Sequence, residues 1–379
     1  MEALPAIKRV CARNFLSLRD ACIDLGKLNI LIGPNASGKS NITTVFRLIQ
    51  SISLHGAPSL EDYRFESIFY AMDMTKVVEV NVELENGYRY KLELYGEGGY
   101  KEEITSPKGE VIYRFDGKSG YFGYISVGSV ERTGSLNYLS QMNFKDGSYT
   151  VYRSILSLKP MPYDVSDDLK TVARALAGIS ACKPDPYTLK ARDRVEMEPR
   201  LWYDGRGLAR FLLHLYLERR RDFQRVEEAV RSLVPEVEEL IPHLERGEVE
   251  LWVRVRGLDA PLRPENISDG TLRLLAIVTA LYSGGSLVVL EEPENHIHPH
   301  LLEALVDMAR SSPSQVVVTT HSTHILDYVE PGEVYLVYKE GLETKVERLT
   351  ESSSIDEVRR FLEEGGTLGE AWYSGVVRR

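Results

Sequence analysis

Apolar and polar positions in the first 54 residues follow two periodicities. Residues 7–14 and 27–32 are short runs rich in apolar side chains, which predicts strands, and a glycine follows the second run. Residues 39–54 instead place apolar side chains three and four positions apart, which predicts a helix. A glycine-rich turn therefore lies between a buried strand and a helix.

The next part of the chain, residues 76–127, has the alternation of a β-meander. Residues 78–82 and 88–95 alternate apolar with polar side chains, and Asn86-Gly87 between them is a strong hairpin signal. We expect antiparallel strands here, inserted in or laid against the rest of the fold.

The pattern becomes helical over residues 167–235 and then alternates between helices and buried strands. The expected elements of the last part are a helix over 271–282, a strand over 287–290, a helix over 301–310 and a strand over 316–320. Such alternation is typical of an α/β protein with a mostly parallel sheet.

The sequence has no internal repeat and no low-complexity linker between domains. The boundaries that we predict are therefore subdomain boundaries within one compact unit. They are residues 1–54 and 247–379 for the two halves of a core, 55–165 for a β-rich insert, and 166–246 for a helical lobe. The predicted fold is α/β, with a mixed central sheet, an antiparallel β subdomain and a helical lobe.

Composition narrows the function classes. The 379 residues are 43% hydrophobic and 27% charged, and no apolar run is long enough to span a bilayer. The net charge of −10 argues against a protein that coats DNA, and the arginines at 219–221 lie among acids, as on a solvated helix face. The three cysteines fit no metal site and suggest no disulfide framework, so we expect a reducing, cytoplasmic setting.

The glycine-rich turn matches a phosphate-binding loop in full. Its residues are Gly33, Pro34, Asn35, Ala36, Ser37, Gly38, Lys39 and Ser40, followed by Asn41. Backbone N–H groups and the helix N-terminus would hold phosphates, Lys39 would reach the β- and γ-phosphates of ATP, and the Ser40 hydroxyl would bind Mg²⁺.

Polar residues with a place in this chemistry follow two later strands. Glu291 and Glu292 end one apolar run, and His321 ends the next. Because ligands bind at the carboxyl edge of α/β sheets, we expect Glu291 to hold Mg²⁺ and Glu292 to activate the attacking water. His321 would contact the γ-phosphate.

Two further motifs each allow two interpretations. Ser268 and Gly270 begin a helix, so they form an N-cap and also an anion site whose phosphate the pattern does not identify. The three histidines at 296, 298 and 300 could suggest zinc, but structural zinc takes four ligands and no fourth is visible at a suitable spacing.

Together these motifs resemble the ATP-binding-cassette superfamily of P-loop NTPases, and within it the compact, soluble RecF/SMC-like ATPases. The resemblance rests on residues 14–18 and 28–35, the signature-like residues 267–273, the acidic stretch 291–299, residues 320–322 and the tail 368–375. It covers both ends of the chain strongly and the middle hardly at all.

The resemblance implies a homodimer that encloses two ATP molecules. Ser268 and Gly270 of one chain would contact the γ-phosphate held by Lys39 of the other, and hydrolysis through Glu292 would reopen the dimer. Catalysis would involve Lys39, Glu292 and His321.

This chain departs from the family pattern at three places. Glu291 replaces the usual aspartate, and Ala36 replaces a frequent glycine. The glutamine that usually links ATP to the helical lobe is not evident; Gln141 is a weak candidate, and Gln50 lies inside the first helix.

Two biological settings stay open. The first is an ATP-driven switch in DNA repair or chromosome handling, with DNA as partner. The second is the ATPase sensor of a phage-defence or toxin–antitoxin system that controls a protein effector. A transporter subunit is a weaker alternative, because membrane-spanning segments are absent from the sequence.

Overall fold

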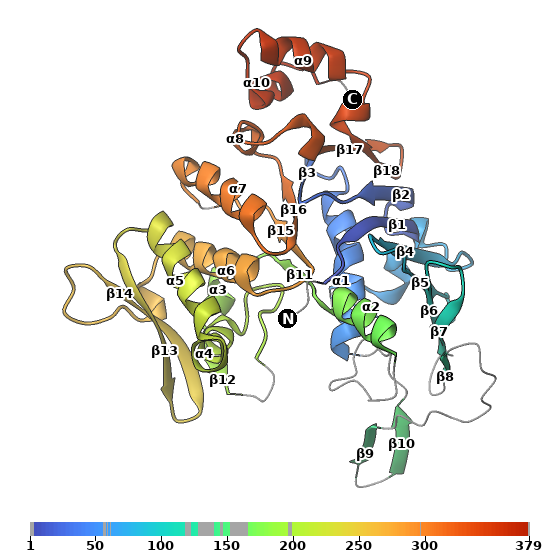
Figure 1. The fold of residues 1–379 in the computed structure, drawn as a ribbon, viewed down its shortest axis with the longest axis horizontal. Coiled ribbons are helices and arrows are strands. Elements are labelled where there is room, and N and C mark those ends of the chain that lie inside the picture. Colours follow the sequence, from blue (N-terminus) through green and yellow to red (C-terminus); the bar gives the residue numbers. More distant parts are fainter. Residues whose placement is uncertain are drawn as a thin grey trace. The chain divides into compact units, whose positions relative to one another are not determined.

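The computed structural model describes residues 4–55, 58, 60, 62–117, 123–127, 140–144, 147–151, 166–195, 199–295 and 297–377. Figure 1 shows the helices and strands of the chain, coloured along the sequence. The chain divides into two units, each assembled from three separate segments. Unit 1 comprises residues 1–26, 33–179 and 335–347, and unit 2 comprises residues 27–32, 180–334 and 348–379. The four-part division drawn from the sequence stays a prediction.

Unit 1 is built on a seven-stranded sheet with the order β2-β1-β4-β5-β6-β7-β8. Its strands are β1 (Ile7–Phe15), β2 (Leu18–Asp24), β4 (Val78–Leu84), β5 (Arg89–Leu94), β6 (Tyr100–Thr105), β7 (Val111–Gly117) and β8 (Gly123–Val127). Every pairing is antiparallel, which confirms the predicted meander. Gly87 has a φ of 85° in the turn after β4, as the Asn-Gly signal predicted.

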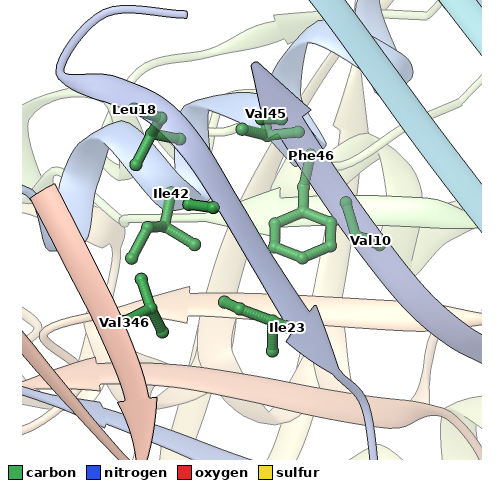
Figure 2. A pocket seen from close by; sticks show the side chains of 9 residues that line it. Val10, Leu18, Ile23, Ile42, Val45, Phe46 and Val346 are labelled. Carbon is green, nitrogen blue, oxygen red and sulfur yellow. The ribbon is translucent and has the colours of Figure 1, made fainter.

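Helix α1 (Lys39–His55) covers the first two strands of unit 1 with its apolar side. Phe46, Ile42 and Val45 meet side chains of β1 and β2, such as Val10 and Ile23, around a cavity of about 10 Å³ (Figure 2). So small a space holds at most one water molecule, and its lining is apolar. The packing fixes the helix whose first residues belong to the glycine-rich turn.

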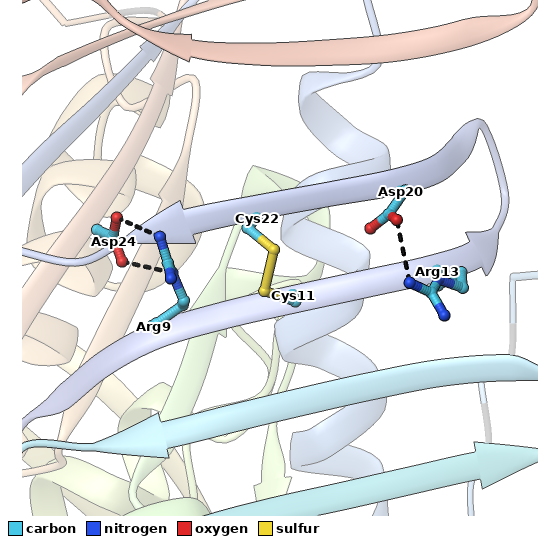
Figure 3. The surroundings of a disulfide bond; sticks show 6 residues. All are labelled: Arg9, Cys11, Arg13, Asp20, Cys22 and Asp24. Carbon is cyan, nitrogen blue, oxygen red and sulfur yellow. Dashed lines mark hydrogen bonds and ion pairs between the residues drawn. A yellow bond between two sulfur atoms is a disulfide. The ribbon is translucent and has the colours of Figure 1, made fainter. Parts of the chain in front are cut away.

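A disulfide joins Cys11 and Cys22 on the outer side of the same hairpin (Figure 3). The two residues are directly opposite in the β1–β2 register, with ion pairs Arg9–Asp24 and Arg13–Asp20 on either side. The expectation of unpaired cysteines was wrong, because linear spacing does not show which cysteines face each other across a hairpin. The bond removes the argument from cysteine usage for a reducing setting.

The rest of unit 1 consists of shorter elements. They are the 3-10 helices η1 (Phe65–Ile68) and η2 (Tyr70–Met72), the hairpin β9 (Ser140–Phe144) and β10 (Gly147–Val151), and helix α2 (Asp167–Ala177). Strands β17 (Val334–Glu340) and β18 (Glu343–Arg348) lie side by side and belong to this unit except for their outermost residues.

Unit 2 contains the parallel part of the fold. Strand β15 (Leu287–Glu291) pairs with β16 (Gln315–Thr320), and β16 pairs with β3 (Leu28–Ile32), both in parallel. Strand β11 (Ile179–Cys182) lies beside β15. All residues of β3, β15 and β16 are buried, which explains why these strands appear in the sequence as largely apolar runs without alternation.

Helices and a small sheet complete unit 2. The helices are α3 (Pro186–Leu189), α4 (Leu208–Glu218), α5 (Arg220–Leu233), α6 (Asp269–Tyr282), α7 (Leu302–Ser311), α8 (Thr323–Leu326), α9 (Ile355–Glu363) and α10 (Leu368–Tyr373). Short 3-10 helices are η4 (Pro264–Asn266), η5 (Pro299–Leu301), η6 (Pro331–Glu333) and η7 (Leu349–Glu351). The sheet has the order β12-β14-β13, with β12 (Asp193–Arg194), β13 (Val237–Glu245) and β14 (Glu248–Val255).

The predicted helices over 271–282 and 301–310 and the strands beside them are confirmed as α6, α7, β15 and β16. The helical region over 167–235 contains α2, α4 and α5, but it also contains the short strands β11 and β12. No helix in the described part of the chain is long and apolar enough to cross a membrane.

Candidate functional site

The glycine-rich turn connects β3 to α1, as the sequence predicted. The ammonium of Lys39 donates hydrogen bonds to the carbonyl oxygens of Gly33 and Pro34, at 2.7 and 2.9 Å. Lys39 is 6% exposed, so the loop holds a nearly buried cation. The side chains of Asn35, Ala36 and Ser40 are exposed around it. A cation within a loop at a helix N-terminus is suited to bind an anion.

Two residues of the loop have left-handed backbone conformations. Gly38 has a φ of +103°, and a Cβ atom there would lie 2.0 Å from the Thr344 hydroxyl oxygen, so only glycine fits. Ala36 has a φ of +61°. An alanine pays a conformational cost in this region that a glycine avoids. The replacement of the family's frequent glycine by Ala36 therefore puts strain into the loop.

A relay of side-chain hydrogen bonds supports the loop from behind. Asn41 Nδ2 donates to Ser17 Oγ, which lies 2.7 Å from Thr344 Oγ1, and Thr344 Oγ1 donates to the Ser37 carbonyl oxygen at 3.0 Å. Sequence analysis did not identify Thr344, because no motif surrounds it and its partners are distant in the chain. The relay fixes the carbonyl of Ser37 by a hydrogen bond from a buried threonine.

The loop passes a simple test for phosphate binding. Ser37 is 2% exposed, and its hydroxyl oxygen has no hydrogen-bond partner among the described residues. Buried hydroxyls are normally paired, so this one is suited to a ligand oxygen. The exposed Ser40 hydroxyl can bind a magnesium ion, for which hydroxyl and carboxylate oxygens are appropriate ligands.

The acidic pair lies in unit 2, at the end of β15. Glu291 is the last residue of the strand and is 3% exposed. Glu292 has a φ of +48°, and its N–H donates to the Thr319 carbonyl oxygen at 2.9 Å. This left-handed residue turns the chain away from the sheet while it stays tied to β16. Such strain in a residue other than glycine often marks a functional site.

Three side chains surround the Glu292 carboxylate. Asn295 Nδ2 donates to Glu292 Oε2 at 3.0 Å, and His321 Nε2 lies 3.6 Å from Glu292 Oε1. Lys183 Nζ lies 3.4 Å from Glu292 Oε2 and 3.9 Å from Glu291 Oε2. The sequence pattern placed Glu291, Glu292 and His321 at one edge of the sheet. It did not reveal Lys183.

Glu294 holds the end of β16 in place beside this group. Its Oε1 accepts a hydrogen bond from Thr320 Oγ1 at 2.7 Å and one from the His321 N–H at 3.3 Å. Glu294 is thus a positioning residue for His321. The sequence pattern did not reveal this role of Glu294.

The signature-like motif begins α6. Ser268 Oγ accepts from the Thr271 N–H at 3.1 Å, which confirms the predicted N-cap. Asp269 pairs with Lys190 at 2.6 Å. Ser268 is exposed, and Gly270 is partly exposed, so both are accessible to a ligand.

The other candidates from the sequence fall outside these groups. Gln141 lies in β9, and Gln50 is buried within α1. The rings of His298 and His300 lie 4.4 Å apart, while residue 296 is outside the described residues. Clusters of three or more metal-binding side chains are absent from the part of the chain that the structure describes.

The site residues are therefore gathered in two groups. Unit 1 holds the phosphate loop from Gly33 to Asn41. Unit 2 holds Glu291, Glu292 and His321 together, with Ser268 and Gly270 at the start of α6.

A family model described as "AAA domain, putative AbiEii toxin, Type IV TA system" matches residues 28–120 and 162–327, more than half of the chain. The "OLD nuclease" of Thermus scotoductus is 22% identical in a match that covers 96% of this chain and 69% of that protein.

Two solved structures have the same fold. The Smc head domain with an extended coiled coil from Pyrococcus furiosus, bound to the C-terminal domain of ScpA, has a TM-score of 0.57 and 14% identity, covering 95% of this chain and 99% of that one. An SmcHead bound to the C-winged helix domain of ScpA has a TM-score of 0.53 and 15% identity, covering 90% and 98%. The predicted α/β fold class is confirmed, and the fold is similar to that of SMC head domains.

Proposed function

Because the chain belongs to the family of AAA domains described as putative AbiEii toxins of type IV toxin–antitoxin systems, we propose that it is a magnesium-dependent ATPase that closes as a homodimer around two ATP molecules. One observation carries the proposal. In the parallel sheet Ile32, directly before Gly33, is the register partner of Thr320, directly before His321, and Glu291 pairs with Thr319. Ile32, the last residue before the phosphate loop, thus ends its strand at the sheet edge where the acidic pair and the histidine follow their own strands.

The loop would bind the phosphates of ATP. Lys39 would turn its ammonium from the carbonyl oxygens of the loop to the β- and γ-phosphates, and Ser37 Oγ would gain a partner. Ser40 and Glu291 would hold the magnesium ion. Bound Mg²⁺ neutralises charge on the β- and γ-phosphates. The remaining contacts would come from Gly33, Pro34, Asn35, Ala36, Gly38 and Asn41.

Glu292 would orient and deprotonate the attacking water. Its left-handed backbone and the hydrogen bond from Asn295 fix the direction of its carboxylate. His321 Nε2, 3.6 Å away, would donate a hydrogen bond to the γ-phosphate. A general base must be held at a defined position to act on water, and these contacts fulfil that requirement.

The exposed signature residues support a shared site. Ser268 and Gly270 lie at the N-terminus of the 14-residue helix α6, where N–H groups favour an anion. In a two-fold dimer these residues would complete the site of the partner, so each ATP would contact both chains.

Two settings remain for this ATPase. The SMC-head fold supports a switch in DNA repair or chromosome handling. The family description favours the second setting, in which the ATPase controls an effector of a defence or toxin–antitoxin system. Around α5, Arg219 and Arg225 pair with Asp222 and Arg231 pairs with Glu227, so acidic side chains accompany three arginines of this cluster and weaken its attraction for DNA.

The two settings differ in one measurement. ATP turnover that rises with double-stranded DNA at low salt and returns to the basal rate at high salt would support a DNA partner. Turnover that is indifferent to DNA, with a co-purifying effector, would support the second setting. A cytoplasmic location stays a prediction, and the Cys11–Cys22 bond runs against it, because disulfides are rare in the cytosol.

A single substitution tests the central proposal. Glu292→Gln should bind ATP without turnover and should elute as a dimer from a sizing column that contains ATP and Mg²⁺. Glu303→Gln, at an exposed glutamate of α7, should behave as the wild type. A Glu292→Gln protein that stays monomeric with ATP, or one with unchanged turnover, would contradict the proposal.

A further inference from the structure

Lys183 is a cation placed at the acidic pair by a part of the chain that no motif covers. It directly follows β11, the strand beside β15. Its ammonium lies 3.4 Å from Glu292 Oε2 and 3.9 Å from Glu291 Oε2, so one lysine contacts both carboxylates. These are the two side chains to which the proposed function gives the magnesium ion and the attacking water.

The backbone of Lys183 is fixed on both sides. Its N–H donates to the Tyr203 carbonyl oxygen at 2.6 Å, and the Asp185 N–H donates to the Asp204 carbonyl oxygen at 2.9 Å. Asp185 then caps α3. The side chain itself is 40% exposed, in contrast to Glu291 at 3%. The lysine is therefore anchored at its base, while its ammonium can leave the carboxylates without disturbing the fold.

The position of the ammonium follows from charge. Two successive carboxylates, one of them buried, are costly without a nearby cation. Lys183 supplies a positive charge to both. A magnesium ion held by the Glu291 carboxylate would lie close to this ammonium, because Mg²⁺ prefers carboxylate ligands. Two cations at one pair of carboxylates repel each other, so the lysine and the ion compete.

We propose that Lys183 is the internal counter-cation of the acidic pair and that Mg²⁺ must displace it when ATP binds. The lysine thereby sets the magnesium concentration at which nucleotide is held. It contacts both carboxylates before the ion arrives. This inference rests on the proposed function.

The test measures magnesium dependence and needs no turnover. A fluorescent, non-hydrolysable ATP analogue (mant-AMPPNP) is held at constant concentration with the full chain, MgCl₂ is titrated, and the anisotropy gives the midpoint. In Lys183→Met the midpoint should fall about fivefold. This factor corresponds to the attraction between two unit charges about 4 Å apart in water, which Mg²⁺ must break in the wild type. Lys183→Arg keeps the charge and should keep the wild-type midpoint.

Lys91→Met is the matched control. The Lys91 side chain is 41% exposed and its ammonium lies 3.3 Å from Glu79 Oε2 and 2.5 Å from Glu93 Oε1, so it too contacts two carboxylates, but none of the proposed site. Its substitution should leave the midpoint unchanged. A midpoint that shifts alike in both methionine variants would overturn the proposal.

The remaining outcomes separate this inference from the function on which it rests. If the wild type binds the analogue in a magnesium-dependent way and Lys183→Met has the same midpoint or a higher one, Lys183 is not a competing cation. If the wild type binds no analogue at any magnesium concentration, the proposed ATPase function itself fails. Thermal unfolding of each variant shows that it is folded, and an unfolded Lys183→Met leaves the comparison of Lys183→Gln with Lys183→Arg to decide.

Discussion

Thr344 Oγ1 donates a hydrogen bond to the carbonyl oxygen of Ser37 at 3.0 Å, although the two residues are 307 positions apart. Thr344 is completely buried, and the same oxygen lies 2.7 Å from Ser17 Oγ. The back of the phosphate loop is thus attached to β18. The conformation of the loop depends on a residue that has no motif of its own.

Replacement of this threonine by valine should therefore destabilise unit 1. Thr344→Val keeps the shape but removes the hydroxyl, which leaves the Ser37 carbonyl without its donor. We expect a loss of about 2 kcal/mol in the free energy of unfolding, the cost of an unsatisfied buried group. Urea denaturation measures it. Thr171→Val, which removes a surface hydroxyl bonded to the Asp167 carbonyl oxygen, should cost less than about 0.5 kcal/mol. Equal losses in both variants would refute the role of Thr344.

Ala36→Gly should change the free energy of unfolding in the opposite direction. The φ of +61° at Ala36 suits glycine, so the substitution should raise the free energy of unfolding by about 1 kcal/mol. Ala177→Gly, in the last turn of α2, should lower it by about 0.5–1 kcal/mol, because glycine weakens an ordinary helical position. A loss of stability in both variants would show that the loop does not have this conformation in solution.

The disulfide between Cys11 and Cys22 should resist alkylation until it is reduced. In denaturant without reductant only Cys182 should react, and after reduction all three cysteines should react, as mass spectrometry can count. In the native protein at pH 8 Cys182 should also be inert, because burial raises the pKa of its thiol to about 12 and keeps it protonated. Reduction should lower the free energy of unfolding by about 1–3 kcal/mol. Three reactive cysteines in unreduced, denatured protein would show that the bond does not form.

Two inactive variants should restore one another if the sites are shared. In a mixed dimer of Lys39→Ala and Ser268→Ala chains, both substitutions fall in one site and the other site is intact. Random mixing gives half mixed dimers, so the equimolar mixture should regain roughly a quarter of wild-type ATP turnover. Each variant alone, at the same total concentration, serves as the control. A mixture no more active than its components would mean that each chain completes its own site.

The sequence predicted those features that are local. Strand β3, the loop from Gly33 to Ser40 and helix α1 follow from an apolar run, a glycine pattern and a helical period, each within a few residues. The same holds for Glu291 and His321 at the ends of β15 and β16. Their place at one sheet edge follows from parallel pairing alone.

The features that the sequence did not predict depend on strand register and on contacts between residues far apart in the chain. Cys11 and Cys22 pair because the β1–β2 turn sets them opposite one another. Lys183 is one of many lysines until β11 lies beside β15, and Thr344 is an ordinary strand residue until β18 passes behind the loop. Neither position can be found from a window of neighbouring residues.

Each unit is assembled from separate segments of the chain, and this has a consequence while the ribosome synthesises the protein. Strand β3 is made early, but its neighbour β16 is made much later: the Asn29 side chain donates to the Val316 carbonyl oxygen, 287 residues away. At a translation rate of roughly 5–20 residues per second, β3 waits about 15–60 seconds for its partner. Throughout that time the five residues of β3, all buried in the finished protein, are exposed on the nascent chain as an aggregation-prone segment. The growing chain is therefore prone to aggregate until β16 has been made.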